Sequence, residues 1–320
     1  MRGALLALTA VLLTAAPSLA ASPPGLEDPE ATVLSELVVK AVRPAPAWWT
    51  VQKGGSVVYI LGLPEVPVPK RVAWNQAPLQ QHLAGANVLI VPVEGKAGLG
   101  DILPLLRMRS RLKSKTPMEQ TLPEPLRTRF VAARTRLGKP ASRYAGWDPI
   151  FAGQILVGDL YQAAQSQSIN GETIAAITVR QAARRAHVPI RPAASFRVVG
   201  LLDPAIRNLT PQISQTCLAG ALDDVEAGPE ALDAKGAAWA RGDVPGVLAG
   251  PRGFASCLLL IQGGAAFWRQ TMAEEADAVA AELAKPGHAV AMFPIRSLVA
   301  EDGILARLKA RGFEVSRGRS

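Results

Sequence analysis

A short and fully apolar stretch, Val57–Leu61, limits most strongly how this chain can fold. Its valine, tyrosine, isoleucine and leucine side chains follow one another without a polar break, which is typical of a strand buried on both faces. The stretch ends at Gly62, and three prolines follow before Lys70. Because proline cannot donate a ladder hydrogen bond, the strand should end there. Ligands bind beyond the carboxyl ends of strands in helix-covered sheets, so we expect a site at the turn Gly62–Glu65.

A second apolar stretch near the C-terminus has the same design. Ala289–Ile295 is followed directly by Arg296 and Ser297. Between the two stretches, Asn75–Ala84 has the pattern of a helix and Asn87–Val93 that of another buried strand. A strand–helix–strand unit favours parallel pairing. The two ends of the chain are therefore predicted to share one sheet.

The middle of the chain, about 100–255, has few strand patterns. Helices are expected over Leu126–Leu137, Ala152–Gln165, Ile174–His187 and Ala231–Arg241. The predicted fold class is thus mixed α/β (α+β), with a central sheet split between N- and C-terminal parts and a large helical insertion between them. Residues 46–320 are interpreted as a single domain.

The first 20 residues have the composition of a secretory signal peptide. Arg2 precedes an apolar core, and Ser18 and Ala20 are the small residues of a cleavage site after Ala20. A membrane anchor is disfavoured because Pro17 breaks a run that is already short. No later segment of the sequence is long and apolar enough to span a bilayer. We expect a partly ordered arm over 21–45 and a mature protein that is periplasmic or secreted.

The sequence contains two cysteines, Cys217 and Cys257. In an exported chain a disulfide between them is expected, and it would stabilise the fold by about 3–4 kcal/mol through the long loop that it closes. Two separate buried thiols are the alternative.

The net charge is +9, and much of the excess lies between residues 105 and 147. This stretch holds eleven lysines and arginines against two glutamates. It is interpreted as a solvated helical surface; contact with anionic lipid or polysaccharide and docking on an acidic protein are the alternatives. Nucleic-acid binding is disfavoured because the predicted export separates the chain from nucleic acid and no aromatic residues are interleaved with the charges.

Several segments, taken in order, resemble the TraB/GumN family, the bacterial branch of the TIKI-like metallopeptidase group. The resemblance rests on WWTVQKGGSVVYILGLPEVP, ANVLIVPVE, LPEPLRTRFVAARTRLGKPASRYAGWDPIFAGQIL, WARGD and AVAMFPIRSLVAEDGILARLKARGFEV. It covers most of the chain after the leader and implies the family's fold.

The resemblance also implies where a metal-dependent hydrolytic site would lie. Family members place Gly-Thr-x-His after the first core strand and Gly-x-Gly-His after the late strand, together with a glutamate from the intervening strand and an arginine. This chain instead has Gly62–Glu65 and Pro294–Ser297 at the two turns. Pro92 stands where the strand glutamate is expected, with Glu94 two residues away, and Gln262-Gly263 replaces a Glu-Arg pair.

The substituted residues are poor metal ligands. A catalytic metal needs two or more lone-pair donors and an open position for water. Glu65 is a suitable donor, but Ser297 is a neutral hydroxyl and Arg296 would repel a cation. An exposed turn carboxylate is the simpler interpretation of Glu65. The histidines, at positions 82, 187 and 288, have no metal-ligand spacing, so no metal or other cofactor is expected.

Three hypotheses follow. The first is a catalytically inactive pseudo-metallohydrolase that acts as a binding or interaction protein on an unknown protein or envelope component; Gly62, Glu65, Arg296 and Ser297 would be its degenerate cleft positions. The second is a peptidase-like hydrolase whose divalent metal is held by Glu65, Glu94 and a neighbouring acid. The third is an envelope-surface binder that uses the basic stretch 105–147.

Overall fold

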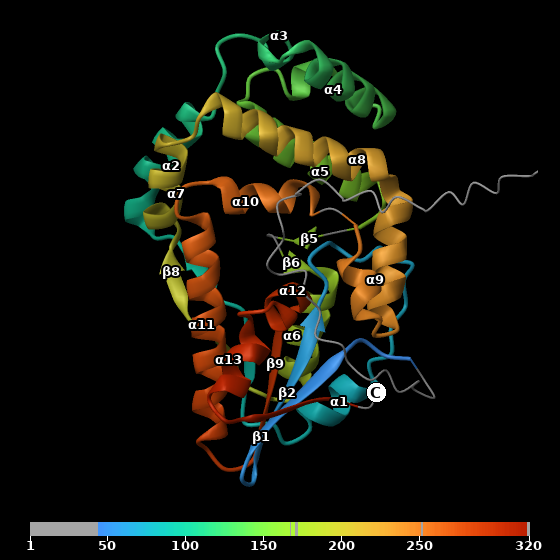
Figure 1. The fold of residues 1–320 in the computed structure, drawn as a ribbon, viewed down its shortest axis with the longest axis vertical. Helices are drawn as coiled ribbons and strands as arrows, with labels where there is room; N and C mark the ends of the chain where they lie inside the picture. The colour runs from blue at the N-terminus through green and yellow to red at the C-terminus, as the bar shows by residue number, and fades with distance from the viewer. Residues whose placement is uncertain (1–43, 167, 170–171, 251, 319–320) are drawn as a thin grey trace, which may run out of the picture.

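The computed structural model describes residues 44–318 except 167, 170, 171 and 251. Within these residues six strands form one mixed sheet (Figure 1). From edge to edge they are β10 (Glu314–Arg317), β1 (Trp48–Lys53), β2 (Ser56–Leu63), β9 (His288–Pro294), β3 (Leu89–Val91) and β7 (Ile190–Pro192). The predicted signal peptide and nearly all of the predicted arm lie outside the described residues.

The sheet joins the two ends of the chain. Strand β1 is antiparallel to β10 and to β2, whereas β2, β9, β3 and β7 are mutually parallel. β2 and β9 are adjacent over their full length, from the pair Val57 and His288 to the pair Leu63 and Pro294. The predicted fold class, a mixed α/β protein with a sheet split between N- and C-terminal parts, is confirmed.

Helices cover both faces of the sheet. They are α1 (Ala77–Leu83), α6 (Ile174–Arg185), α11 (Gly264–Leu283) and α13 (Ile304–Ala310). α1 contacts α6, and α11 contacts α13. Right-handed crossovers place the first pair on one face and α11 on the other. This double cover explains why Ala289–Phe293 of β9 is entirely buried and apolar.

Small side chains bring α6 close to the sheet. Its buried positions are Ala175, Ala176, Val179, Ala182 and Ala183, which recur at helical spacing along one face. The Thr173 side chain caps the first turn by accepting a hydrogen bond from the Ala176 amide at 3.3 Å. The cap fixes where the helix begins, beside the ends of the parallel strands.

A second layer of helices lies beyond the carboxyl ends of these strands (Figure 1). It consists of α3 (Met118–Thr121), α4 (Glu124–Arg136), α5 (Pro149–Ala163), α8 (Pro211–Ala240) and α10 (Cys257–Leu260), with the 3-10 turns η2 (Ala141–Arg143) and η3 (Gly253–Ser256). α9 (Val244–Leu248) contacts α8 but buries Val244 and Val247 in the core of the sheet. The second layer has its own core around Phe130, Tyr144 and Leu156. The predicted helical insertion is therefore present.

The insertion also contributes strands. β7 completes the edge of the main sheet, β8 (Ser195–Arg197) pairs with β4 (Glu94–Lys96), and β5 (Ser168–Ile169) pairs with β6 (Glu172–Thr173). These strands have two or three residues each, too short for a period-2 pattern to develop. The sequence therefore suggested a more purely helical insertion than the structure has.

Helix α8 is longer than the sequence predicted. It begins at Pro211, after Thr210, whose side chain accepts a hydrogen bond from the Ile213 amide at 3.2 Å. Gly228 interrupts it with a φ of 78°, a conformation open to glycine, and Pro229 restarts the helix. The predicted helix Ala231–Arg241 corresponds to the second half alone.

A disulfide joins α8 to α10. Cys217 and Cys257 are both buried, and their Cα atoms are 5.0 Å apart. The predicted pairing is confirmed. The bond fixes the segment around η3 against the long helix, and this segment forms one wall of the cleft described below.

The remaining helices are η1 (Leu99–Asp101), α2 (Ile102–Arg111), α7 (Val198–Arg207) and α12 (Ile295–Val299). α2 and α7 contact each other at one side of the molecule (Figure 1). In the part of the chain that the structure describes, none of the helices is long and apolar enough to cross a membrane.

Candidate functional site

The turns after β2 and β9 lie side by side. Gly62 is paired with Phe293, one residue before each strand ends. A Cβ atom on Gly62 would lie 2.6 Å from the Cγ1 atom of Ile295 and 2.7 Å from the ring of Trp49, closer than packed carbons approach. Glycine is therefore required here, and it allows two segments far apart in sequence to form one site.

A buried tryptophan fixes the first turn. Trp239, at the end of α8, donates a hydrogen bond from Nε1 to the carbonyl oxygen of Gly62 at 2.8 Å. Four residues later, the side chain of Asp243 accepts from the Gly246 amide at 3.0 Å and caps α9. The WARGD segment thus holds the site in place without lining the cleft, a role that its sequence did not reveal.

The two turns are joined by an ion pair. Arg296 Nε donates to Glu65 Oε2 at 3.0 Å, and Arg252 Nη2 lies 3.9 Å from Glu65 Oε1. The Arg296 side chain is only 4% exposed, and that of Glu65 is 23% exposed. Glu65 is therefore a partly buried carboxylate with a guanidinium group near each oxygen, not the exposed turn residue that the sequence suggested.

These residues do not fit a catalytic metal ion. Two cationic groups stand where a divalent cation would need to approach Glu65, and Ser297 supplies only a buried neutral hydroxyl. Zinc sites need several His, Cys or carboxylate ligands and an open position. Among the described residues, no group of three or more His, Cys, Asp or Glu side chains is placed to hold a metal.

The histidines lie away from this site. His288 begins β9 and so lies at the opposite end of the strand from Pro294; its Nε2 donates to the carbonyl oxygen of His82 at 3.1 Å. His82 lies in α1, and its ring stacks on that of Tyr59 with the ring centroids 3.9 Å apart. Burial, with a smaller contribution from the His288 charge, lowers the pKa of His82 to about 4. His82 is a packing residue.

A cleft of about 420 Å³ opens beside the ion pair at the carboxyl ends of the strands. Its apolar wall includes Leu63, Pro64, Pro92, Val93, Met292 and Trp268. Its charged residues are Glu65, Glu94, Glu172, Arg180 and Arg252. Both turns, the segment after β3, the start of α6, η3 and α11 contribute to it. The structure therefore has a cleft at the turn after β2, where the sequence predicted a site.

Arg180 binds two further carboxylates that line the cleft. It lies within 2.6 Å of Glu94 and also pairs with Glu172. Glu94, the weaker of the predicted metal ligands, is thus engaged by a cation in the same way as Glu65. The two carboxylates proposed for a rearranged hydrolase do line one cleft, but each is bound by arginine.

A buried acid lies behind the cleft wall. Glu275 of α11 is 2% exposed, and its Oε1 atom accepts a hydrogen bond from the Val93 amide at 3.3 Å. Burial raises the pKa of Glu275 to about 8, with Glu274 adding to the increase and the Val93 hydrogen bond opposing it. Glu275 therefore carries a proton at neutral pH. Its burial could not be predicted from the sequence, because a lone glutamate in an amphipathic helix is usually exposed to solvent.

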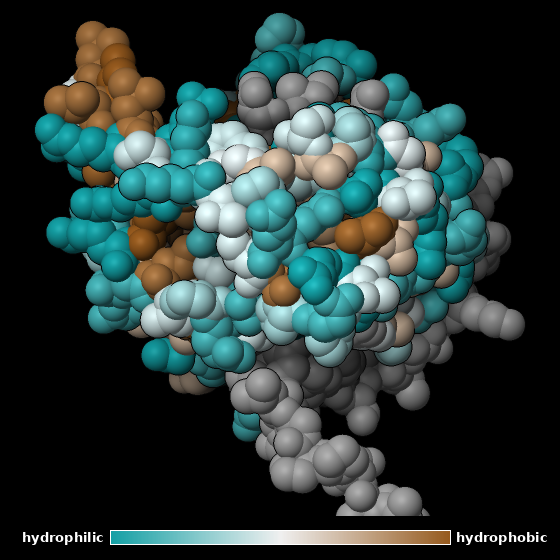
Figure 2. Space-filling model, turned by 90° about the horizontal axis from the view of Figure 1, so that it is seen from above, coloured by the Kyte–Doolittle hydropathy of each residue, from teal (hydrophilic) through white to brown (hydrophobic). Residues whose placement is uncertain are grey.

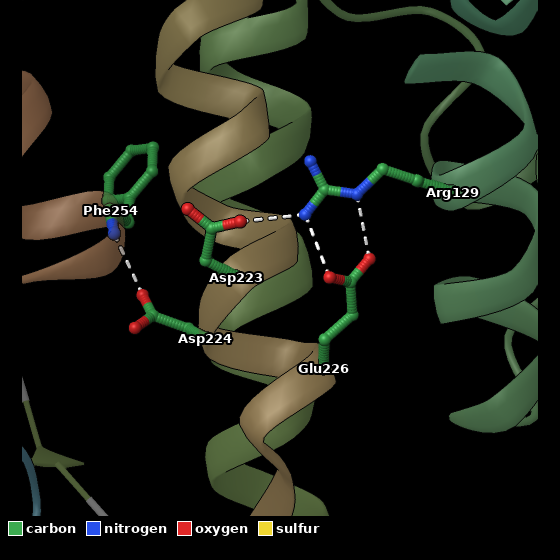
Figure 3. A network of polar contacts seen from close by, with 5 residues as sticks. All are labelled: Arg129, Asp223, Asp224, Glu226 and Phe254. Atoms are coloured by element: carbon green, nitrogen blue, oxygen red, sulfur yellow. Dashed lines mark hydrogen bonds and ion pairs between the residues drawn. The ribbon is translucent and has the colours of Figure 1, made fainter. Parts of the chain in front are cut away.

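The helical layer holds η3 in place through Asp224 of α8. Its carboxylate accepts a hydrogen bond from the Phe254 amide at 2.8 Å (Figure 3). Burial raises the pKa of Asp224 to about 6 despite this hydrogen bond. η3 directly follows Arg252, so Asp224 and the disulfide together position the arginine that faces Glu65.

These features define an α/β protein with an apolar cleft at the ends of its parallel strands and arginine–glutamate pairs at its rim. The model of the TraB/PrgY/gumN family matches residues 47–317. The chain belongs to the TraB/PrgY/gumN family. No curated protein and no solved structure matches it.

Proposed function

We propose that the protein is a non-hydrolytic member of this family that binds a ligand or partner segment in its cleft. The observation that carries the proposal is the ion pair between Glu65 and Arg296. It joins the two turns at which the hydrolytic ligands were expected, and it places a guanidinium group against the one suitable carboxylate. The chain has a cleft where the hydrolytic site was expected, but the residues there favour binding of a ligand over metal-assisted hydrolysis.

The cleft suits a ligand with an apolar body and a charged or polar end. Its volume is within the range of small-molecule sites, about 300–1,000 Å³. The apolar side chains, Trp268 among them, would cover the body of the ligand. The paired groups at the rim, Arg252 with Glu65 and Arg180 with Glu94, would select its charged end.

We also propose that the chain is exported, with cleavage after Ala20, so that it acts in the periplasm or outside the cell. The disulfide between Cys217 and Cys257 supports this location because such bonds persist in oxidising compartments. Expression in a bacterial host followed by N-terminal sequencing of the protein recovered from the periplasm tests it. Recovery of an intact N-terminus from the cytoplasm alone would contradict it.

Metal analysis with a broad peptidase assay tests the absence of hydrolysis. We expect substoichiometric Mn, Co and Zn in the purified protein and no turnover after any of these metals is added. Stoichiometric metal together with peptide cleavage that disappears in Glu65→Ala would overturn the proposal. It would favour the hydrolase hypothesis, in which Glu65, Glu94 and a neighbouring acid bind the metal.

Binding is tested with anilinonaphthalene sulfonate, which combines an apolar ring system with an anionic group. We expect saturable binding that is lost when Ala255→Phe fills the cleft. The double variant Leu103→Asp/Leu106→Asp, which changes an apolar surface on α2, is the control and should retain the site. Equal binding by wild type and Ala255→Phe would show that the cleft is not the binding site.

A further inference from the structure

An apolar tip projects from one side of the molecule. Leu99, Ile102, Leu103 and Leu106 are 89%, 53%, 57% and 54% exposed. Their spacing places them along one face of η1 and α2, and Leu202 of the adjacent α7 is exposed as well. Among the described residues, Leu260 is the only large apolar side chain of comparable exposure elsewhere. Figure 2 shows a hydrophobic projection at the upper left edge with hydrophilic residues at its base.

The structure divides the basic stretch 105–147 into two parts. Most cations of its second half are neutralised by nearby acids: Arg127 by Glu124, Arg129 by Asp223 and Glu226, Arg134 by Glu119, and Lys139 and Arg143 by Asp159. This part is an internally paired surface of the helical layer. It offers little net charge to a partner.

The first half keeps most of its charge: Arg111 pairs with Asp203 at 3.0 Å, but the other four cations do not pair in this way within the described residues. Arg107, Arg109, Lys113 and Lys115 are exposed, and no ion pair joins them to an acid in the described part of the chain. Arg109 lies over the ring of Trp147 at 5.6 Å. Arg107 is one helical turn from Leu103, so the outward-facing cations adjoin the apolar tip.

We propose that the apolar tip, Leu99–Leu106 with Leu202, inserts into the surface of an anionic lipid bilayer while Arg107 and its neighbours contact the headgroups. An exposed apolar row beside a cationic row is the arrangement by which interfacial helices bind membranes. The tip is a projection, whereas peptide-binding surfaces for helices are grooves. Lys96, exposed at the end of β4 just before η1, adds a further cation beside it.

Flotation with lipid vesicles tests the proposal. The chain beginning at Ala21 is used, because the apolar leader would bind lipid by itself. We expect binding to vesicles that contain phosphatidylglycerol and at least tenfold weaker binding to pure phosphatidylcholine. Leu103→Asp/Leu106→Asp should weaken binding at least tenfold, and Arg107→Glu/Lys113→Glu several-fold. High salt should reduce the electrostatic part, because exposed charges are screened beyond a Debye length.

Ala281→Asp/Ala310→Asp is the matched control. It makes the same change in charge on exposed positions of α11 and α13 and should bind as the wild type does. Thermal melting of every variant shows whether a loss of binding reflects unfolding. Equal binding by the tip variant and this control would overturn the proposal.

A fluorescent probe tests insertion directly. The fluorescence of an environment-sensitive label on Leu99→Cys should shift to the blue when anionic vesicles are added, whereas that of a label on Ala310→Cys should not.

Sedimentation equilibrium tests the alternative that the tip binds a second copy of the chain. A dimer that Leu103→Asp/Leu106→Asp dissociates, without vesicle binding by the wild type, would overturn the proposal in favour of self-association. Absence of both vesicle binding and a probe shift would equally overturn it.

Discussion

The cleft and the helical layer both contain arginine–carboxylate pairs, but they differ in burial. At the cleft, the Arg296 side chain is 4% exposed where it meets Glu65. In the helical layer, Arg129 of α4 is 36% exposed where it binds Asp223 and Glu226 of α8 (Figure 3). Arg129 makes three hydrogen bonds of 2.7–2.8 Å to these two carboxylates, yet we expect its removal to matter less than the loss of the Glu65–Arg296 pair.

The reason is the surrounding solvent. Exposed ion pairs are screened by water and lose side-chain entropy, so most contribute little to stability. A buried pair contributes little compared with apolar replacements, but removal of one partner leaves an uncompensated charge in a poorly solvated site. The location of an ion pair, and not its number of hydrogen bonds, should decide the effect of a substitution.

The largest effect should come from the disulfide, which joins the two regions. Cys217→Ser/Cys257→Ser opens a loop of 40 residues and should lower the free energy of unfolding by about 4 kcal/mol. Because α10 and η3 would then be held less firmly, binding at the cleft should also weaken. Chemical denaturation measures the first effect and dye titration the second. Loss of stability with unchanged binding would show that the disulfide does not position the cleft wall.

Removal of one partner of the cleft pair should have the next largest effect. Glu65→Ala should destabilise the protein by about 3 kcal/mol, the lower end of the range for buried pairs because Glu65 keeps part of its surface in solvent. Glu65→Leu/Arg296→Met removes both charges and should recover most of this loss. A double variant less stable than Glu65→Ala would show that Arg296 stabilises the fold through other contacts.

The buried acid behind the cleft should make stability depend on pH. Glu275 has a pKa raised from 4.5 to about 8, so the folded protein retains a proton that the unfolded chain loses between these values. Stability should therefore fall as pH rises from 4.5 to 8, by up to a few kcal/mol, since one pKa unit corresponds to about 1.4 kcal/mol.

The matched variant is Glu275→Gln, which keeps an oxygen for the Val93 amide but does not titrate in this range. Urea denaturation at pH 5 and pH 9 should give a smaller decrease for this variant than for the wild type. Identical decreases would show that Glu275 ionises in the folded protein without cost. Asp224, whose pKa is raised to about 6, remains in both proteins, so its contribution cancels.

The smallest effect should come from the exposed network. Arg129→Ala removes its contacts to Asp223 and Glu226 and should cost less than about 1 kcal/mol. Thermal melting in low and high salt measures it, and the difference from wild type should shrink as salt screens the pair. If Arg129→Ala lowered stability as much as Glu65→Ala does, burial would not explain the difference between exposed and buried ion pairs.

Much of the sheet could be predicted from local patterns. The runs Val57–Leu61 and Ala289–Ile295 are apolar because both of their faces are covered, and glycine or proline marks where they end. Two elements of the insertion escaped prediction for different reasons. β7 has three residues, too few for a period to be recognised. α7 has ten residues, but Pro204 lies inside it, and an internal proline normally indicates a helix break.

The site could be predicted only in part. The two turns were found because each follows a buried strand, and Glu65, Arg296 and Ser297 were named from their positions there. Arg252 and Arg180 escaped prediction because exposed and cleft-lining arginines look alike in a sequence rich in arginine. The ion pairs of the basic stretch could not be predicted either, because partners such as Asp223 and Glu226 are almost a hundred residues away from Arg129.

The sequence by itself determined the apolar strands, the turns that end them and the family to which the chain belongs. These depend on neighbouring residues, because periodicity and backbone restrictions act over a few positions. Only the tertiary structure decided that Glu65 meets Arg296, that Glu275 is buried and that the leucines of α2 stay in solvent. Each of these depends on which distant segments of the chain pack against a side chain and exclude water from it. The residues next to that side chain in the sequence do not determine this packing.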